Sequence, residues 1–196
     1  MRIILASKSP RRREILEELG LEFEIITADC DESSDITDGG ELVTSLATRK
    51  GRAVLEKLGE ALEDTLIIAC DTLVYASGEF LGKPKDFDDA YRMISLLSGG
   101  SHEVISGIYL YFNGKESGGF ASTRVFFDNM SDDTIRNYIA DGEPMDKAGA
   151  YAIQGLAGIY ISKIEGDYSN VVGLPKNLLF KTLKEDFGLD VFDLKS

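Results

Sequence analysis

The feature that most constrains the fold is a nearly continuous apolar run, Leu66–Tyr75 (LIIACDTLVY), which Asp71-Thr72 interrupts. Such a run is typical of a central strand buried on both faces, as in sheets covered by helices. An ionised carboxylate in that position is costly unless it is paired or binds a metal, and such residues often carry catalysis. The run therefore predicts a central strand. Asp71 is either a catalytic or metal-binding residue, or a structural one satisfied by backbone groups or a salt bridge.

Strand and helix patterns alternate on both sides of this run. Before it, they predict a strand at Arg2–Ser7, a helix from Pro10 (behind Ser9) to Gly20, a strand at Glu22–Thr27, an acidic loop at 29–40 and a helix at Glu41–Leu58. After it, they predict a turn-rich segment at Gly78–Lys85, a helix at Asp86–Leu97, paired strands at His102–Phe112 and Ala121–Phe127, a helix from Ser131 to Ala140, a glycine-broken strand at Gly149–Ile164, a loop at Asn170–Pro175 and a helix at Leu178–Phe187. The 196 residues thus predict one α/β domain, or one domain with two lobes.

Composition excludes several classes of protein. Hydrophobic residues make up 43% of the chain, which is typical of a globular protein and not of a disordered one. The chain has no apolar stretch of ~20 residues, so we expect no membrane span. The basic cluster follows the first apolar run, which is the wrong order for a signal peptide, so we expect a cytoplasmic protein with Cys30 and Cys70 reduced and structural. The net charge of −13 argues against binding to bulk nucleic acid.

Metal chemistry is also constrained. His102 is the one histidine, which excludes a histidine-rich zinc site, and we expect it to have a structural or supporting role. Any metal is therefore expected to be held by carboxylates, as a hard divalent cation such as Mg²⁺ or Mn²⁺ is.

The charges are unevenly distributed. Residues 1–13 contain five basic residues and no acidic one, whereas residues 14–48 contain eleven acidic residues and no Lys or Arg. Two interpretations are open. One is a grip for a polyphosphate next to a metal site, and the other is a solvated helix face followed by a solvated loop.

The segment Ala6-Ser7-Lys8-Ser9-Pro10-Arg11-Arg12 lies between the first strand and the first helix. Unpaired N–H groups and the helix dipole favour an anion at that place. Arginine adds fork-shaped donors that match phosphate oxygens. The segment is not a Walker loop, because GxxxxGK[ST] is absent. It predicts a phosphate site, the alternative being an ordinary capped helix with surface arginines.

Two later segments are weaker signals. Gly82-Lys83-Pro84 is a turn that carries a cation, and a surface turn explains it equally well. In Asp146–Gly155 (DKAGAYAIQG), small residues allow a ligand to approach the backbone. Here Lys147 is a candidate for binding phosphate, and the Gln154 amide is a candidate for reading a base edge. A glycine-rich loop packed on its neighbours is the alternative.

Six segments occur in an order that resembles the Maf family of nucleoside triphosphate pyrophosphatases. They are LASKSPRR, CDTLVY, LGKP, SGGSHEV, DKAGAYAIQG and NVVGLP, and together they span Leu5 to Pro175. The resemblance implies a mixed α/β, two-lobed fold with a central cleft, like that of inosine triphosphate pyrophosphatases. It implies hydrolysis of a nucleoside triphosphate between the α and β phosphates, a divalent metal, and a homodimer in many members. The predicted apolar strands at 104–127 are a candidate dimer interface.

The resemblance also assigns residues, position by position. Asp71 matches the proton acceptor that activates water. Glu32 matches an acidic position near the metal, and with Asp71 it would hold the cation. The positions that match substrate-binding residues of the family are Ser7, Arg11, Arg12, Lys50, Thr72, Lys83 and Gln154, to which the residues of the DKAGAYAIQG loop add Lys147.

Arg12, Thr72 and Gln154 together resemble the branch of the family that acts on dTTP and UTP, and resemble the 7-methyl-GTP branch less. Two residues depart from the family pattern. Cys70 stands where alanine is usual, and Ala152 stands where glycine is common. If the latter position needs a positive φ, Ala152 would strain the loop. The alternative functions are a non-enzymatic regulator of cell division that binds nucleotides or DNA, and a phosphatase that releases orthophosphate stepwise.

Overall fold

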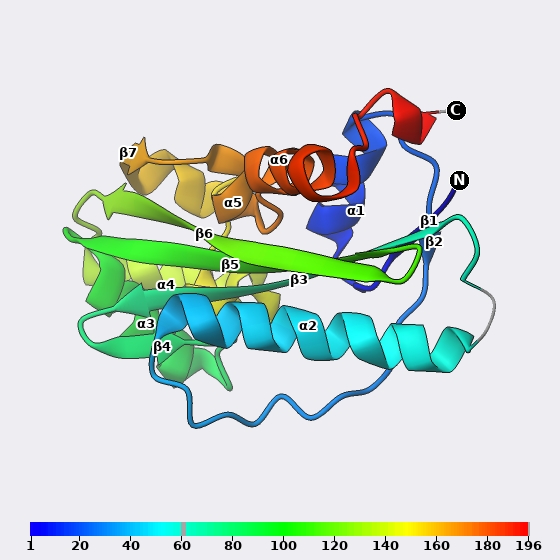
Figure 1. Ribbon diagram of the computed structural model, residues 1–196. Helices are drawn as coiled ribbons and strands as arrows, with labels where there is room; N and C mark the ends of the chain where they lie inside the picture. Colours follow the sequence, from blue (N-terminus) through cyan, green and yellow to red (C-terminus); the bar gives the residue numbers. More distant parts are fainter. Residues whose placement is uncertain (60–61, 196) are drawn as a thin grey trace. The chain divides into compact units, whose positions relative to one another are not determined.

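The apolar run forms the middle of a 12-residue strand, β3 (Thr65–Ala76), in the computed structural model, which describes residues 1–59 and 62–195 (Figure 1). Leu66, Ile67 and Ile68 are completely buried, and Asp71 is 8% exposed. The predicted central strand and the mixed α/β class are therefore confirmed. The described residues group into two compact units, and the boundary between them falls within β3, after Asp71.

The first unit comprises Met1–Asp71, Ser106–Ala121 and Gly173–Ser196. Strand β1 (Arg2–Leu5) pairs in parallel with β3 on one side and with the short β2 (Glu24–Ile25) on the other. Helices α1 (Pro10–Glu18) and α6 (Lys176–Phe187) lie on one face of these strands, and α2 (Gly39–Leu58) runs along the other (Figure 1). This cover explains why β3 is apolar on both faces.

Two glycines allow α2 to lie unusually close to β5 (Ser101–Phe112). A Cβ atom on Gly51 would lie 2.0 Å from a ring carbon of Tyr109, and one on Gly107 would lie 2.4 Å from the backbone of Val43. A side chain at either position would push the helix away from the sheet. Helix α2 is therefore fixed against the strands at both its first and its middle turns.

The second unit comprises Thr72–Ile105 and Ser122–Val172. It contains β4 (Glu79–Leu81), which is antiparallel to β3, and β7 (Ile161–Glu165), which is antiparallel to β6 (Lys115–Phe127). Its helices are α3 (Phe87–Leu97), α4 (Asp132–Ala140) and the short α5 (Tyr168–Val172). Apolar residues of α3 and α4 share one core with the ends of the strands, which include Val74, Val104 and Val125.

By hydrogen bonding, the strand order is β2-β1-β3-β5-β6-β7, with β4 attached to β3. The predicted helices and long strands are confirmed within a few residues. Four predictions differ from the structure, three of them slightly. Gly78–Lys85 contains β4, β6 begins at Lys115 instead of Ala121, and α5 covers part of the predicted loop at Asn170–Pro175.

The largest error concerns Gly149–Ile164, which was expected to be a broken strand. Apart from the start of β7, this segment consists of 3₁₀ turns at Ala148–Ala150 and Leu156–Tyr160 joined by irregular backbone. Gly149 and Ala150 have φ values of 68° and 60°, in the left-handed region that a strand cannot use. The strand therefore begins only at Ile161.

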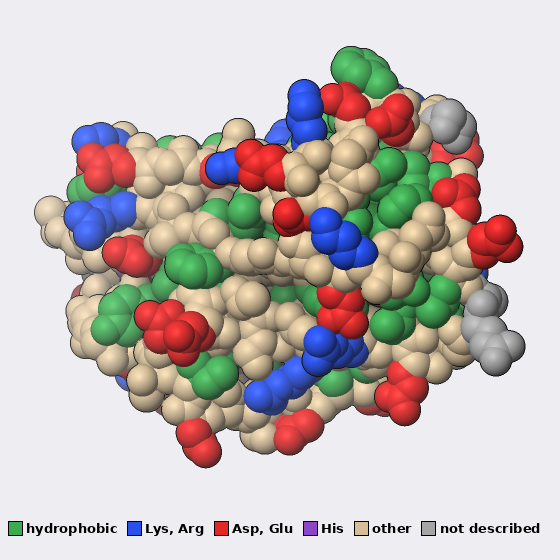
Figure 2. All heavy atoms as spheres, in the orientation of Figure 1, with side chains coloured by type: hydrophobic (Ala, Val, Ile, Leu, Met, Phe, Trp, Pro, Cys, Tyr) green, Lys and Arg blue, Asp and Glu red, His purple; other side chains and the backbone are tan. Residues whose placement is uncertain are grey.

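No helix in the described ranges is long and apolar enough to cross a bilayer. On the face shown in Figure 2, Lys and Arg side chains are interspersed with Asp and Glu side chains. The predictions of a single domain with two lobes and a cleft, and of a cytoplasmic location, stay predictions.

Candidate active site

The loop after β1 is organised around the Ser7 hydroxyl. Ser7 Oγ accepts hydrogen bonds from the Ser9 backbone N–H at 3.2 Å and from Arg12 Nη1 at 3.0 Å. Helix α1 begins at Pro10, as predicted, and Ser9 occupies the N-cap position, but the Ser9 side chain makes no capping hydrogen bond. The start of α1 is therefore shaped by Ser7 and Arg12 and not by a Ser9 cap.

Arg12 joins three segments that are far apart in the sequence. Its Nε donates to the Gly173 carbonyl at 2.8 Å, and its Nη1 donates to the Cys70 carbonyl at 2.7 Å as well as to Ser7. The Cys70 thiol also contacts the Gly173 carbonyl, at 3.2 Å. One guanidinium thus connects the N-terminal motif, the strand motif before Asp71 and the NVVGLP motif. Arg11, next to it on α1, is half-buried.

Asp71 is paired with a lysine from α2. Lys50 Nζ directly contacts Asp71 Oδ1 and lies 3.0 Å from Glu32 Oε2. The Lys50 side chain is 22% exposed. Burial lowers the pKa of Lys50, but the charges and hydrogen bonds of Asp71 and Glu32 outweigh that effect and raise it above the ordinary value. The buried aspartate is thus satisfied by a salt bridge, and the same bridge brings three predicted site residues together.

The position of Glu32 depends on the neighbour of Lys50 in the sequence. Arg49 Nη1 donates to the Ser33 carbonyl at 2.6 Å and to the Asp31 carbonyl at 3.2 Å. These bonds hold the acidic loop, predicted as 29–40, on α2 at the residues that flank Glu32. The proximity of Glu32 to Asp71 is therefore built into the backbone and does not depend on the Lys50 contact alone.

The two carboxylates suit a hard cation only in part. In the described part of the chain, no three His, Cys, Asp or Glu side chains come together as a metal-binding group. Mg²⁺ commonly uses one or two carboxylates and completes its shell with water and substrate phosphates. Glu32 and Asp71 therefore fit a cation that is shared with a bound polyphosphate.

Four predicted residues belong to the second unit: Thr72, Lys83, Lys147 and Gln154. The Gly149 N–H donates to the Gly82 carbonyl at 3.0 Å, so the Lys83 turn adjoins the loop that carries Lys147 and Gln154. Lys83 and Gln154 are exposed, whereas Lys147 Nζ donates to the Glu143 carbonyl at 2.7 Å and pairs with Asp146.

Glu143 is an organising residue that the sequence analysis did not identify. Its carboxylate accepts hydrogen bonds from the Tyr138 hydroxyl at 3.0 Å and from the Leu156 N–H at 2.9 Å, while its carbonyl accepts one from Lys147. It therefore ties the two ends of the loop that contains Gln154. Its partner at Leu156 is 13 residues away across irregular backbone, so no local pattern signals the contact.

His102 supports the same loop from β5. Its Nε2 lies 2.7 Å from the Tyr151 hydroxyl, and both rings pack edge-on or tilted against Phe127. His102 is 3% exposed, and burial lowers its pKa to about 4. The imidazole is thus neutral near pH 7 and packs among aromatic side chains, in agreement with the expected structural or supporting role.

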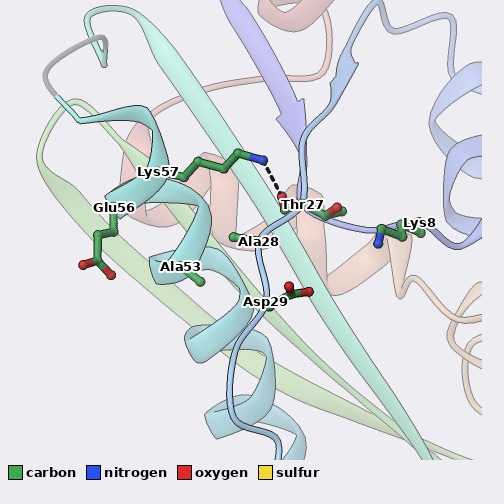
Figure 3. A pocket seen from close by; sticks show the side chains of 7 residues that line it. All are labelled: Lys8, Thr27, Ala28, Asp29, Ala53, Glu56 and Lys57. Carbon is green, nitrogen blue, oxygen red and sulfur yellow. Dashed lines mark hydrogen bonds between the residues drawn. The ribbon is translucent and has the colours of Figure 1, made fainter.

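The first unit also contains a cavity of about 570 Å³ (Figure 3). It is lined by Lys8, Thr27, Ala28, Asp29, Ala53, Glu56 and Lys57. Figure 3 shows Lys57 reaching across from α2 to the Thr27 carbonyl, to which its ammonium donates at 2.9 Å. None of the predicted site residues lines this cavity.

Comparisons with known proteins establish the family. The model described as Maf-like protein matches residues 2–186, so the chain belongs to the Maf family. A protein of Caldanaerobacter subterraneus subsp. tengcongensis is 45% identical over 191 residues, which cover 96% of this chain and 91% of that protein. A protein of Thermococcus kodakarensis is 46% identical over 189 residues, which cover 96% of this chain and 98% of that protein. Both relatives are named dTTP/UTP pyrophosphatase.

Among solved structures, the Staphylococcus aureus Ham1 protein matches 65% of this chain and 72% of its own, with a TM-score of 0.46 and 13% sequence identity. A likeness of this extent is too slight to support an argument about function.

Proposed function

We propose that this protein hydrolyses dTTP and UTP to the monophosphates and pyrophosphate. The observation that carries the proposal is the buried carboxylate of Asp71, held by Lys50 beside Glu32, in a chain 45–46% identical to proteins named dTTP/UTP pyrophosphatase. A buried acid beside a partly buried cation is needless for simple nucleotide binding. The two suit a reaction in which a proton is taken from water while negative charge develops on phosphate.

In the proposed mechanism, Asp71 accepts a proton from the attacking water. The water oxygen bonds to a phosphorus of the α–β bridge, and the bridging oxygen leaves with the bond electrons, which gives monophosphate and pyrophosphate. Glu32 and Asp71 would hold a divalent cation, Mg²⁺ or Mn²⁺. When bound, such a cation neutralises phosphate charge and lowers the pKa of nearby water.

Cationic and hydroxyl side chains would bind the phosphates. We assign this role to Ser7, Arg11, Arg12, Lys50, Lys83 and Lys147. Arg12 acts at least partly by positioning, since its guanidinium holds the Cys70 and Gly173 carbonyls. Arginine and lysine at this site would offset the charge that develops on the leaving pyrophosphate.

The base would be selected by Thr72 and Gln154. Gln154 is exposed on a loop fixed at both ends by Glu143, and its amide both donates and accepts hydrogen bonds. This assignment distinguishes the dTTP/UTP branch from the 7-methyl-GTP branch.

The test is the identity of the products from a nucleotide panel. The protein is incubated with Mg²⁺ and dTTP, UTP, CTP, ATP, GTP or 7-methyl-GTP, and orthophosphate is separated from pyrophosphate. We expect pyrophosphate, released fastest from dTTP and UTP. Orthophosphate would instead indicate a stepwise phosphatase, and saturable binding without turnover would indicate a regulator. Fast turnover of 7-methyl-GTP would refute the role of Thr72 and Gln154.

The Asp71→Asn variant tests the proton acceptor. We expect turnover to fall by about 10²–10⁴-fold, the usual contribution of a general base. Asp64→Asn is the matched control, because Asp64 lies just before the same strand and its exposed carboxylate forms an ion pair with the N-terminal amine. A folded Asp71→Asn protein with near-normal turnover would refute the assignment.

Chelation tests the metal. Turnover should vanish in excess EDTA and return with Mg²⁺ or Mn²⁺. Full activity in EDTA would contradict the proposed requirement. The expected homodimer stays a prediction, which light scattering would check.

A further inference from the structure

The carboxylates proposed to share a cation with the substrate already share one in this structure. The ammonium of Lys50 contacts Asp71 and lies 3.0 Å from Glu32. Two carboxylates and one ammonium leave a net charge of −1 on the group. A free divalent cation must therefore compete with a cation that is covalently part of the protein.

Lys50 is held in this place by the packing of its own helix. The next residue, Gly51, lies so close to Tyr109 that a Cβ atom would come within 2.0 Å of the ring. On its other side in the sequence, Arg49 fastens the acidic loop through the Ser33 and Asp31 carbonyls. The close packing of Gly51 thus fixes the backbone next to Lys50 on the sheet, and Arg49 holds the loop that carries Glu32 on the same helix.

Binding of a polyphosphate would change the competition between Lys50 and a divalent cation for the two carboxylates. A polyphosphate offers Lys50 an alternative set of anionic oxygens, and lysine binds phosphate as a mobile point charge on a flexible stem. It also supplies oxygens that two carboxylates alone lack for a complete Mg²⁺ shell. The released carboxylates would then hold the cation together with the phosphate oxygens.

We propose that Lys50 is the resident counter-ion of Glu32 and Asp71, which prevents tight binding of a divalent cation until a nucleotide draws the ammonium away. The proposal rests on the proposed function, because it takes the ligand to be a nucleoside triphosphate. It predicts an order of binding: the cation binds with the nucleotide or after it, and not to the free protein.

The test measures Mn²⁺ binding by the full-length protein without nucleotide, by electron paramagnetic resonance of the free ion. We expect Lys50→Met to bind Mn²⁺ at least ten-fold more tightly than the wild type. Lys57→Met is the matched control, since Lys57 lies on the same helix but donates to a backbone carbonyl, and it should leave Mn²⁺ affinity unchanged. Adding Asp71→Asn to Lys50→Met should abolish the gain. Equal Mn²⁺ affinity in the wild type and the Lys50→Met protein would overturn the proposal.

A second measurement needs no variant and applies even if Lys50→Met does not fold. The wild-type protein is titrated with Mn²⁺ in the presence and absence of a non-hydrolysable dTTP analogue that has an imido group between the α and β phosphates, with a correction for Mn²⁺ bound by the analogue alone. The proposal expects at least a ten-fold gain in affinity, and an equal affinity in both titrations would refute it. If Lys50→Met gains Mn²⁺ affinity but the wild type hydrolyses no nucleotide, the proposed function alone is refuted. If the wild type hydrolyses nucleotide but neither measurement shows a gain in Mn²⁺ affinity, the counter-ion role of Lys50 alone is refuted.

Discussion

Arg12 offers a sharp test of how the site is held together, because its neighbour Arg13 is a natural control. Both arginines lie in the first turn of α1. Arg12 donates to the carbonyls of Cys70 and Gly173 and to the Ser7 hydroxyl, at 2.7–3.0 Å. Arg13 makes a 3.4 Å ion pair with Glu17, and both of these side chains are about half exposed, at 49% and 54%. Replacing each arginine by alanine compares a connecting arginine with a surface one.

The expected magnitudes follow from these contacts. Hydrogen bonds to a charged donor contribute about 1.5–3 kcal/mol each and are not additive, so we expect Arg12→Ala to lower the free energy of unfolding by about 2–4 kcal/mol. An exposed i,i+4 ion pair contributes about 0.3–0.5 kcal/mol, which sets the expectation for Arg13→Ala. For a chain of this size, about 2–4 °C are lost per kcal/mol, so Arg12→Ala should lower the Tm by roughly 5–15 °C.

The assay is urea unfolding followed by far-UV circular dichroism, with the midpoint and slope fitted for the wild type and both variants. A change in midpoint at constant slope reports a change in stability. Equal losses in the two variants, or a loss below about 0.5 kcal/mol for Arg12→Ala, would refute the role of Arg12 as a connection between three motifs. Arg12→Lys should recover less than half of the loss, because one ammonium lacks the planar fork that spans these acceptors.

Two further predictions concern the loop with Gln154. Because the folded pKa of His102 is about 4 and the unfolded value is about 6.5, the unfolded state takes up the proton first, and stability falls as the pH is lowered from 6.5 to 4. Across this window the wild type should lose about 3 kcal/mol more unfolding free energy than His102→Gln, as measured by urea titrations at each pH, and parallel profiles would contradict the assignment. Gly149→Ala should destabilise the protein by more than Gly142→Ala. Both have positive φ values, of 68° and 89°, but a Cβ at 149 would lie 2.9 Å from Val74 Cγ2, whereas one at 142 meets nothing within 4 Å. Strain alone costs about 1–2 kcal/mol, and equal losses in urea would refute the close contact.

The elements that the sequence predicted correctly are those whose pattern is local. The apolar run of β3 and the spaced apolar residues of α3 each identify their element without knowledge of the rest of the fold. The strand prediction for Gly149–Ile164 failed because the conformation of this segment depends on packing. Ala150 adopts a φ of 60° while completely buried, a conformation that its residue type disfavours and that only its surroundings enforce. The condition under which Ala152 would strain the loop is not met, since Ala152 has no positive φ, whereas Ala150 does.

The contacts of the candidate site could not be predicted from local patterns either. The apolar run singled out Asp71, and the family resemblance added Lys50 and Glu32, but neither indicated that a single ammonium contacts both carboxylates. The sequence also identified Arg12 as a cation suited to phosphate, whereas the structure commits this side chain to carbonyls 58 and 161 residues away. Contacts across such separations depend on the register of strands and the packing of helices, which residue patterns do not encode locally.

The uneven charge of the first 48 residues illustrates the point most clearly. Two interpretations were open, a solvated surface and a polyphosphate grip beside a metal site. In the structure, some of these charged residues pair with each other at the surface, and another lies at the candidate site. Arg2 pairs with Glu24 and Arg13 with Glu17 at the surface, while Glu32 reaches the partly buried ammonium of Lys50. The basic cluster therefore does not act as one unit. Because exposed pairs are weak and screened by salt, whereas the partly buried pair of Lys50 and Asp71 is screened much less, raising the ionic strength should weaken the surface pairs first and the Lys50–Asp71 pair least.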